Sequence, residues 1–206
     1  MILYGASGHC KVIIDCLKSQ NEIITAIIDD DIKKDSFYGF KVLHSTERIE
    51  KNDRLIISIG DNRIRKNIAE RLDCIFGTAI NIKSIVGATV KIGEGTVIMH
   101  NAVIQADTVL GKHVIINTSA SVDHDCLIED YVHISPKVAL CGAVEVGEGT
   151  HIGAGAVVIP GKKIGKWCIV GAGSVVIKDI PDYAVVVGNP GRIIKSFNPF
   201  ADKNEK

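Results

Sequence analysis

The sequence predicts an α/β domain of the Rossmann-like, nucleotide-binding kind, followed by an all-β parallel solenoid. Every sixth residue from Val86 to Val176 is aliphatic, which makes sixteen consecutive matches. A helix repeats near 3.6 residues and a flat strand near 2, so a period of six indicates short stacked units that share one core. The N-terminal domain is predicted by a strand, a glycine loop and a helix, with an acidic cluster after the second strand.

Residues 1–77 carry the pattern of the α/β domain. We expect strands at 1–5, 23–28, 40–43 and 55–59, one helix from the glycine loop to residue 18, and a second helix ending at about residue 72. The loop at Gly5–His9 lacks the full spacing of a dinucleotide fingerprint, so a tight strand-to-helix turn is the alternative interpretation. In the functional interpretation, its backbone N–H groups and the helix N-terminus hold a phosphate.

Three further positions mark the carboxyl ends of these strands, where ligands of such domains bind. Asp29 and Asp30 follow the second strand and can accept hydrogen bonds from ribose hydroxyls or a base, although with Asp31 they also fit a solvated turn. Gly60 follows the last strand of the domain. Together these positions favour a nucleotide site.

The solenoid is expected over residues 78–182. Four positions after each aliphatic residue comes a second, mostly small or β-branched one, and a glycine often follows the aliphatic residue directly, where we expect it to ease a corner with positive φ. Three units of six close a triangular coil of eighteen residues, so sixteen units give a little over five coils. Residues eighteen apart should therefore stack at about 4.8 Å, the spacing of neighbouring strands.

Residues 183–206 form a tail with one more apolar run, Ala184–Val187, before the sequence Gly188-Asn189-Pro190-Gly191-Arg192. We expect this tail to pack back along the solenoid and to cover its last coil, because an open sheet edge invites aggregation.

Composition excludes several classes of function. The 24 basic and 24 acidic residues balance, and no basic stripe suits nucleic acid or acidic lipid. No apolar run approaches the ~20 residues that span a bilayer, and the N-terminus lacks the pattern of a signal peptide. The six cysteines form no CxxC pair, and two of them, Cys126 and Cys168, fall on inward positions of the repeat. We therefore expect a cytoplasmic location.

His124 is the strongest candidate for chemistry. It occupies the third position of its unit, where a side chain points outward, so a solvated surface imidazole is the alternative interpretation. Asp123 and Asp125 flank it, and a carboxylate beside an imidazole raises its pKa and makes it a better general base. Gly142 stacks one coil further on, and its bare backbone N–H can serve as an oxyanion donor.

His133 lies nine residues after His124, half a coil away, and is expected to contact a ligand. A trimer packed side by side can bring such corners of neighbouring subunits together. In the predicted stacking, His133 lies on His151, and Asn117 lies on Ser135.

Several motifs, in this order and over nearly the whole chain, resemble the bacterial sugar acetyltransferases of the PglD/NeuD type. They are GASGH, IDD, SIGDNRIR, Asn117-Thr118-Ser119, His124-Asp125-Cys126, His133-Ile134-Ser135-Pro136 and the closing GNPGR. The resemblance implies a left-handed β-helix of the hexapeptide-repeat acyltransferase superfamily and a homotrimer with acetyl-CoA between neighbouring helices. It also implies an N-terminal domain that binds the nucleotide of a UDP-linked 4-amino-sugar, whose amine is acetylated directly, without a metal.

The resemblance also assigns roles to residues. His124 is similar to the general base of the family, and Asp125 stands where a well-studied member has Glu. His133 is similar to a residue near the acetyl group, and Ala154 and Ala172 to positions that line the coenzyme channel. The positions similar to the nucleotide-sugar side are Ser7, Gly8, His9, Asp29, Asp30 and Gly60, and we add Asn117 to this substrate-binding set.

Three alternatives stay open. The first is sialic acid O-acetylation, because a hydroxyl and an amine need the same base. The second is a zinc enzyme like the γ-type carbonic anhydrases. His133 and His151 stack suitably for it and His100, His113 and His124 are available, but a third ligand is not evident. The third is a non-catalytic scaffold, which the Asp/His cluster argues against.

Overall fold

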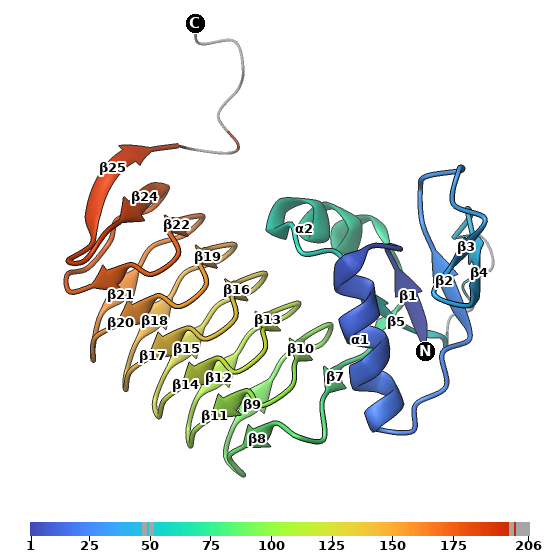
Figure 1. The fold of residues 1–206 in the computed structure, drawn as a ribbon, viewed down its shortest axis with the longest axis horizontal. Helices are drawn as coiled ribbons and strands as arrows, with labels where there is room; N and C mark the ends of the chain where they lie inside the picture. Colours follow the sequence, from blue (N-terminus) through green and yellow to red (C-terminus); the bar gives the residue numbers. More distant parts are fainter. Residues whose placement is uncertain (47–48, 50–51, 198–199, 201–206) are drawn as a thin grey trace, which may run out of the picture.

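The computed structural model describes residues 1–46, 49, 52–197 and 200. An N-terminal α/β domain lies beside the first coils of a long solenoid, whose last coils are at the opposite end of the molecule (Figure 1). Both parts of the predicted fold class are confirmed, whereas the boundaries at residues 77 and 182 stay a prediction.

The N-terminal sheet has the strand order β3-β4-β2-β1-β5-β6. All its pairs are parallel except that of β3 with β4. The order reverses at β1, so the carboxyl ends of β1, β2 and β5 converge on one edge, where ligands bind in this architecture. The sequence pattern did not predict β3 and β6, which have two residues each. The strands are β1 (Ile2–Tyr4), β2 (Ala26–Ile28), β3 (Ser36–Phe37), β4 (Phe40–Leu43), β5 (Arg54–Ile57) and β6 (Ile75–Phe76).

Two helices cover opposite faces of this sheet. Helix α1 (Gly8–Ser19) buries apolar residues at helical spacing against Leu3 and Ile56. Helix α2 (Asn62–Arg71) is capped by Asp61, whose carboxylate accepts a hydrogen bond from the Ile64 N–H at 2.8 Å. It packs on the other face.

The solenoid consists of two-residue strands that form three parallel faces. The first face holds β7 (Ala79–Ile80), β10 (Val97–Ile98), β13 (Ile115–Ile116), β16 (His133–Ile134), β19 (His151–Ile152) and β22 (Ile169–Val170). The second holds β8 (Ile85–Val86), β11 (Val103–Ile104), β14 (Ser121–Val122), β17 (Ala139–Leu140), β20 (Val157–Val158) and β23 (Val175–Val176). The third holds β9 (Lys91–Ile92), β12 (Val109–Leu110), β15 (Leu127–Ile128), β18 (Glu145–Val146) and β21 (Lys163–Ile164).

The predicted stacking is confirmed, because residues eighteen apart pair throughout these faces, as His133 does with His151. The predicted aliphatic residues point inward, and those from Ile98 to Val176 are at most 2% exposed. Cys126 and Cys168 are buried thiols in the same core.

The predicted role of the glycines that follow the aliphatic residues is wrong. Positive φ occurs two residues later in most turns, often at residues such as Asp107 and Asp125. The earlier glycines give room for the next coil instead: a Cβ on Gly147 would lie 2.7 Å from the Gly165 backbone, and one on Gly153 would lie 2.6 Å from Ala172 N. Close stacking of backbones, not backbone conformation, selects glycine there.

The tail covers the last strand of the first face. Strand β24 (Ala184–Val187) pairs in parallel with β22, and β25 (Arg192–Ser196) returns antiparallel on β24. The remainder of the predicted tail, at 198–199 and 201–206, lies outside the described residues.

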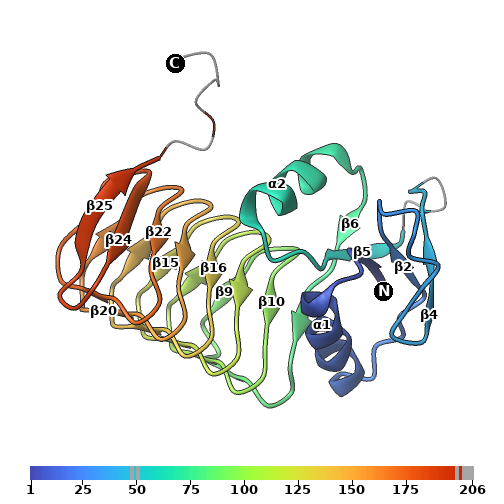
Figure 2. The same cartoon turned by 45° about the horizontal axis from the view of Figure 1, so that its top comes forward.

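The N-terminal domain sits over the first face of the solenoid. Helix α1 packs on Ala79, Val97 and Ile115, and α2 lies over the corner between the third and first faces (Figure 2). This arrangement brings the carboxyl edge of the N-terminal sheet to β16, where His133 lies.

None of the helices within the described residues has the length and apolar character needed to cross a membrane.

Candidate active site

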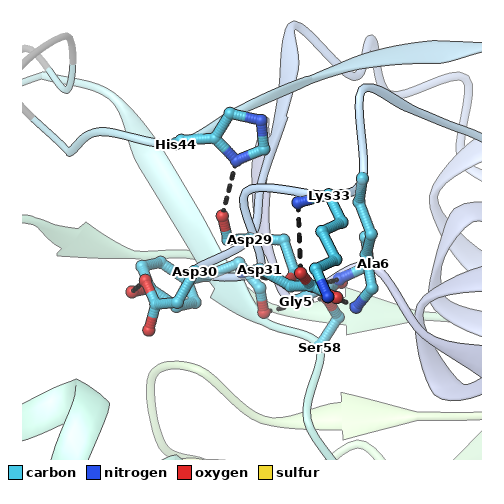
Figure 3. A network of polar contacts seen from close by, with 10 residues as sticks. Gly5, Ala6, Asp29, Asp30, Asp31, Lys33, His44 and Ser58 are labelled. Atoms are coloured by element: carbon cyan, nitrogen blue, oxygen red, sulfur yellow. Dashed lines mark hydrogen bonds and ion pairs between the residues drawn. The ribbon is translucent and has the colours of Figure 1, made fainter.

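The glycine loop is fastened to the end of β2 by Asp29. The Ala6 and Asp31 N–H groups donate to its carboxylate at 2.6 and 2.9 Å (Figure 3). Lys34 Nζ lies 3.0 Å from the same carboxylate. Partial burial favours the neutral acid, but these donors prevail and hold the pKa of Asp29 below its usual value. Asp29 thus orders the loop.

Asp30 remains more open to a ligand, since its side chain is 67% exposed. Tyr4 donates to it at 2.5 Å, and Arg71 pairs with it at 3.1 Å. Burial, and then Asp30, raise the pKa of Tyr4 to about 12, so its hydroxyl stays a donor. These three residues and His44 line a polar pocket of about 370 Å³ at the sheet edge.

The rest of the loop consists of two small, exposed residues, Ser7 and Gly8, and of His9. Ser7 and Gly8 are exposed at the N-terminus of α1, and the Ser7 side chain makes no capping bond. Nε2 of His9 is buried and finds no hydrogen-bond partner among the described residues. Burial, assisted by Arg65, lowers the pKa of His9 to about 4, so the ring is neutral.

His133 joins the two parts of the molecule. Its Nδ1 lies 3.3 Å from the Gly60 carbonyl oxygen, its Nε2 lies 3.2 Å from Asn117 Nδ2, and its ring centre is 6.2 Å from that of His9. Burial, with His151, Arg65 and His9 as further causes, lowers its pKa to about 3. The fold thus gathers predicted residues from both parts around a neutral imidazole.

His124 lies in the turn between β14 and β15, at the corner of the second and third faces. Its Nδ1 is 2.7 Å from Asp125 Oδ2, and its own N–H donates to Asp123 Oδ1 at 2.9 Å. The imidazole is 60% exposed. The hydrogen bond with Asp125, and then the charge of Asp123, raise the pKa of His124. With Nδ1–H given to Asp125, Nε2 presents its lone pair outward.

Gly142 stacks against this imidazole. A Cβ there would lie 2.7 Å from His124 Cε1 and 2.8 Å from Nε2, so only glycine leaves room for the ring. Its N–H has no acceptor among the described residues, whereas the equivalent N–H of Lys112 donates to the stacked Asp130. The residue eighteen positions after Gly142 is Pro160, whose side chain has no acceptor. Gly142 thus brings to the imidazole a residue whose N–H has no acceptor in the described part of the chain.

Ala154 and Ala172 stack on the corner between the first and second faces, where the Gly173 N–H donates to the Ala154 carbonyl at 2.9 Å. Both alanines are exposed. They share this corner with the turn that begins at Asn117. Their role at the coenzyme stays a prediction.

His124 and His133 lie on different parts of one chain. His133 is on the first face, and His124 is at the corner beyond the second face. No contact joins them among the described residues. If both act in one site, a second copy of the chain has to supply one of them.

Sequence analysis missed one central residue and undervalued another. Arg65 is 1% exposed and donates to the carbonyls of His113 and Tyr131. The sequence feature that could have identified Arg65 is its position as a charged residue on the apolar face of the predicted second helix. His151 stacks on His133 with ring centres 4.8 Å apart, and its Nε2 lies 2.8 Å from Ser135 Oγ.

The chain matches two family descriptions, "PglD N-terminal domain" over residues 1–72 and "Bacterial transferase hexapeptide (six repeats)" over 89–124 and 125–160. It is also similar in structure to a mutant of perosamine N-acetyltransferase from Caulobacter crescentus in complex with CoA and GDP-perosamine. The TM-score is 0.91 at 37% identity, over 95% of this chain and 96% of that one. The chain belongs to the PglD-type sugar acetyltransferases. The expected left-handed β-helix follows from this membership.

Two further family members are informative. The acetyltransferase domain of PglB from Neisseria gonorrhoeae in complex with acetyl coenzyme A has a TM-score of 0.88 at 36% identity, over 94% of this chain and 98% of that one. The UDP-N-acetylbacillosamine N-acetyltransferase of Bacillus subtilis is 45% identical over 105 residues, 46% of this chain. That match spans about half the length of the curated relative, 49%.

The described residues contain no group of three or more His, Cys, Asp or Glu side chains arranged to hold a metal ion. The stacked pair His133 and His151 therefore finds no third ligand within that part of a single chain.

Proposed function

We propose that this protein transfers the acetyl group of acetyl-CoA to the amine of a nucleotide-linked sugar, with a UDP-linked 4-amino-sugar as the acceptor. The observation that carries the proposal is the pairing of His124, held by Asp125, with a Gly142 N–H that has no acceptor among the described residues. Its relatives support it, since they are named for N-acetyl transfer to perosamine and bacillosamine sugars.

His124 is the general base in this mechanism. Its Nε2 takes a proton from the sugar amine as the nitrogen attacks the thioester carbonyl, while Asp125 stabilises the imidazolium through Nδ1–H. The Gly142 N–H donates to the oxyanion that develops on that carbonyl. The C–S bond then breaks, and the proton leaves with the thiol of coenzyme A. No covalent intermediate on the protein is needed.

The proposed site is shared between copies in a homotrimer. His124 of one copy faces the corner of a neighbour that carries Asn117, Ala154 and Ala172, with His133 beside it. Support comes from the position of His124 in one chain, which is beyond the second face from His133. The acetyl-CoA would lie along the alanines, where small side chains leave space.

The nucleotide is proposed to bind at the carboxyl edge of the N-terminal sheet. Ser7 and Gly8 are exposed residues at a helix N-terminus, a position that suits a diphosphate. Asp30 offers an exposed carboxylate to ribose or base. A cytoplasmic location fits six cysteines that are all free thiols.

Release of free thiol from acetyl-CoA tests this function, with UDP-linked and GDP-linked amino sugars and sialic acid as acceptors. We expect release with the UDP-linked 4-amino-sugars and loss of it in His124→Ala. Release with GDP-linked sugars alone would contradict the proposed nucleotide. Release with sialic acid alone would replace the proposal with O-acetylation.

A further inference from the structure

Arg65 is a buried cation held entirely by neutral acceptors. Its guanidinium donates to five oxygens at 2.8 to 3.3 Å, of Ile59, Gly60, Asn62, His113 and Tyr131. No carboxylate bonds it among the described residues. Burying an ion is unfavourable even when its hydrogen bonds are satisfied, which indicates a role for Arg65 beyond packing.

The acceptors of Arg65 come from both parts of the molecule. Ile59 and Gly60 belong to the loop after β5, whereas His113 and Tyr131 lie at the corner between the third and first faces of the solenoid. The guanidinium therefore fixes the Gly60 carbonyl relative to the solenoid. A planar fork does this with a geometry that a lysine ammonium cannot reproduce.

The Gly60 carbonyl in turn determines which ring nitrogen of His133 carries the proton. A carbonyl oxygen only accepts, so the nitrogen that faces it, Nδ1, has to carry the proton. Nε2 then holds a lone pair, which accepts from Asn117 Nδ2. Asn117 Oδ1 accepts from the Thr118 N–H at 2.8 Å, so both ends of the amide are oriented.

We propose that Arg65 is a positioning residue of the acceptor site, which acts through the Gly60 carbonyl to hold His133 as its Nδ1–H tautomer and so orients the Asn117 amide toward the sugar. The kinetic part of this inference rests on the proposed function, whereas the tautomer of His133 does not.

The charge of Arg65 supports the same arrangement. Burial is the main cause that lowers the pKa of His133 to about 3, and Arg65 contributes. A protonated His133 has two N–H donors and cannot accept from Asn117. The buried cation thus disfavours the one form of the ring that would break the chain of hydrogen bonds.

Nitrogen NMR of ¹⁵N-histidine-labelled, ligand-free protein reads the tautomer directly, with the His133 signals assigned by their loss in His133→Gln. We expect Nδ1–H in the wild type. Arg65→Lys keeps a cation but loses the fork, and we expect a mixture of tautomers. Lys66→Met is the matched control, because it removes another contact of α2 with the solenoid, to Glu148, and none with the Gly60 loop. We expect it to resemble the wild type.

An Nε2–H tautomer in the wild type, or an unchanged tautomer in Arg65→Lys, overturns the proposal. If Arg65→Lys does not fold, Asn117→Asp replaces it, since an acceptor facing Nε2 should draw a proton onto that nitrogen. If the tautomer of His133 is unchanged in Asn117→Asp, the side chain at 117 is not coupled to His133 by a hydrogen bond. That result also overturns the proposal.

The kinetic arm separates positioning from general damage. We expect Arg65→Lys to raise KM for the acceptor about tenfold, the effect of one misplaced hydrogen bond, and to raise KM for acetyl-CoA less, since His133 and Asn117 also lie beside the proposed coenzyme corner. An equal rise in both would refute the assignment. If no acceptor is found at all, the proposed function fails while the NMR result still stands.

Discussion

His124 owes its proposed chemistry to its immediate neighbours. An exposed imidazole is an ordinary surface group, but Asp125 orients this one, and Gly142 leaves space beside it and has an N–H with no acceptor among the described residues. Sequence spacing predicted these three positions, because stacking at eighteen residues follows from the repeat. It could not predict Arg65, whose solenoid partners lie 48 and 66 residues away and are backbone carbonyls.

Replacing His124 with alanine should lower kcat by about 10²–10⁴, the usual contribution of a general base, without unfolding the protein. The side chain is mostly exposed, so its loss removes little packing. Steady-state kinetics with circular dichroism as the folding control would check this. Activity within a few-fold of wild type would exclude His124 as the base.

The pH profile tests the Asp125 partnership. Asp125 and Asp123 raise the pKa of His124 above its ordinary value near 6.5, and the base works unprotonated, so kcat/KM should fall as the pH drops through that raised pKa. Asp125→Asn removes the main cause and should move the fall to lower pH. Asp107→Asn, at the same turn position one coil earlier, should leave the profile unchanged.

Gly142→Ala should disturb the same site through contact. Its Cβ would lie under 3 Å from the imidazole, so the ring has to move away from its position beside the N–H. We expect a loss of kcat similar to that in His124→Ala. The double variant should lose no more than His124→Ala alone, because both changes act on one unit. Additive losses would mean separate roles.

At the scale of elements, the period of six predicted the coils and the inward residues, and the apolar run Ala184–Val187 indicated the tail strand. It did not show which turn residue has positive φ, because Asn, Asp and other residues accept that conformation along with glycine. The glycines that directly follow the aliphatic residues are required because the backbone of the next coil leaves no room for a Cβ. The spacing of residues in the sequence does not identify this tertiary contact. Strands of two residues, such as β3, are too short for any periodic signal.

Gly147→Ala tests this interpretation of the glycines. Its Cβ would meet the backbone of the next coil at 2.7 Å, so we expect a loss of about 1–3 kcal/mol in the free energy of unfolding, typical of overpacking. Gly8→Ala meets nothing within 4 Å at the start of α1 and should be neutral or slightly stabilising. Thermal unfolding of both variants would check the contrast, and equal Tm values would contradict it.

For the whole molecule, the junction of the two parts depends on neutral histidines around one buried cation. Burial, with Arg65 as a further cause, lowers the pKa values of His9 and His113 to about 4 and that of His133 to about 3. Sequence motifs predicted each half of the candidate site, but not that Arg65 and His133 connect them, since this depends on how α2 docks.

Stability should therefore fall in mild acid. Below the unfolded-state pKa near 6.5, these histidines are protonated in the unfolded chain but stay neutral in the folded protein. The free energy of unfolding should therefore decline from about pH 6.5 to about pH 4. His113→Phe removes one such group at a site that is 2% exposed, and should flatten the decline by roughly 2–3 kcal/mol. Urea unfolding across this range measures it, and an unchanged slope would contradict it.

The reversal at the C-terminus has a consequence for assembly. Strand β24 continues the parallel ladder by one rung, and β25 then runs the opposite way with every residue exposed, Arg192 and Lys195 among them. A ladder that ends in an antiparallel rung with charged side chains is a poor template for the parallel first coil of another molecule, although Ile193 and Ile194 are also exposed there. We therefore expect filament growth along the axis to be disfavoured at this end of the first face.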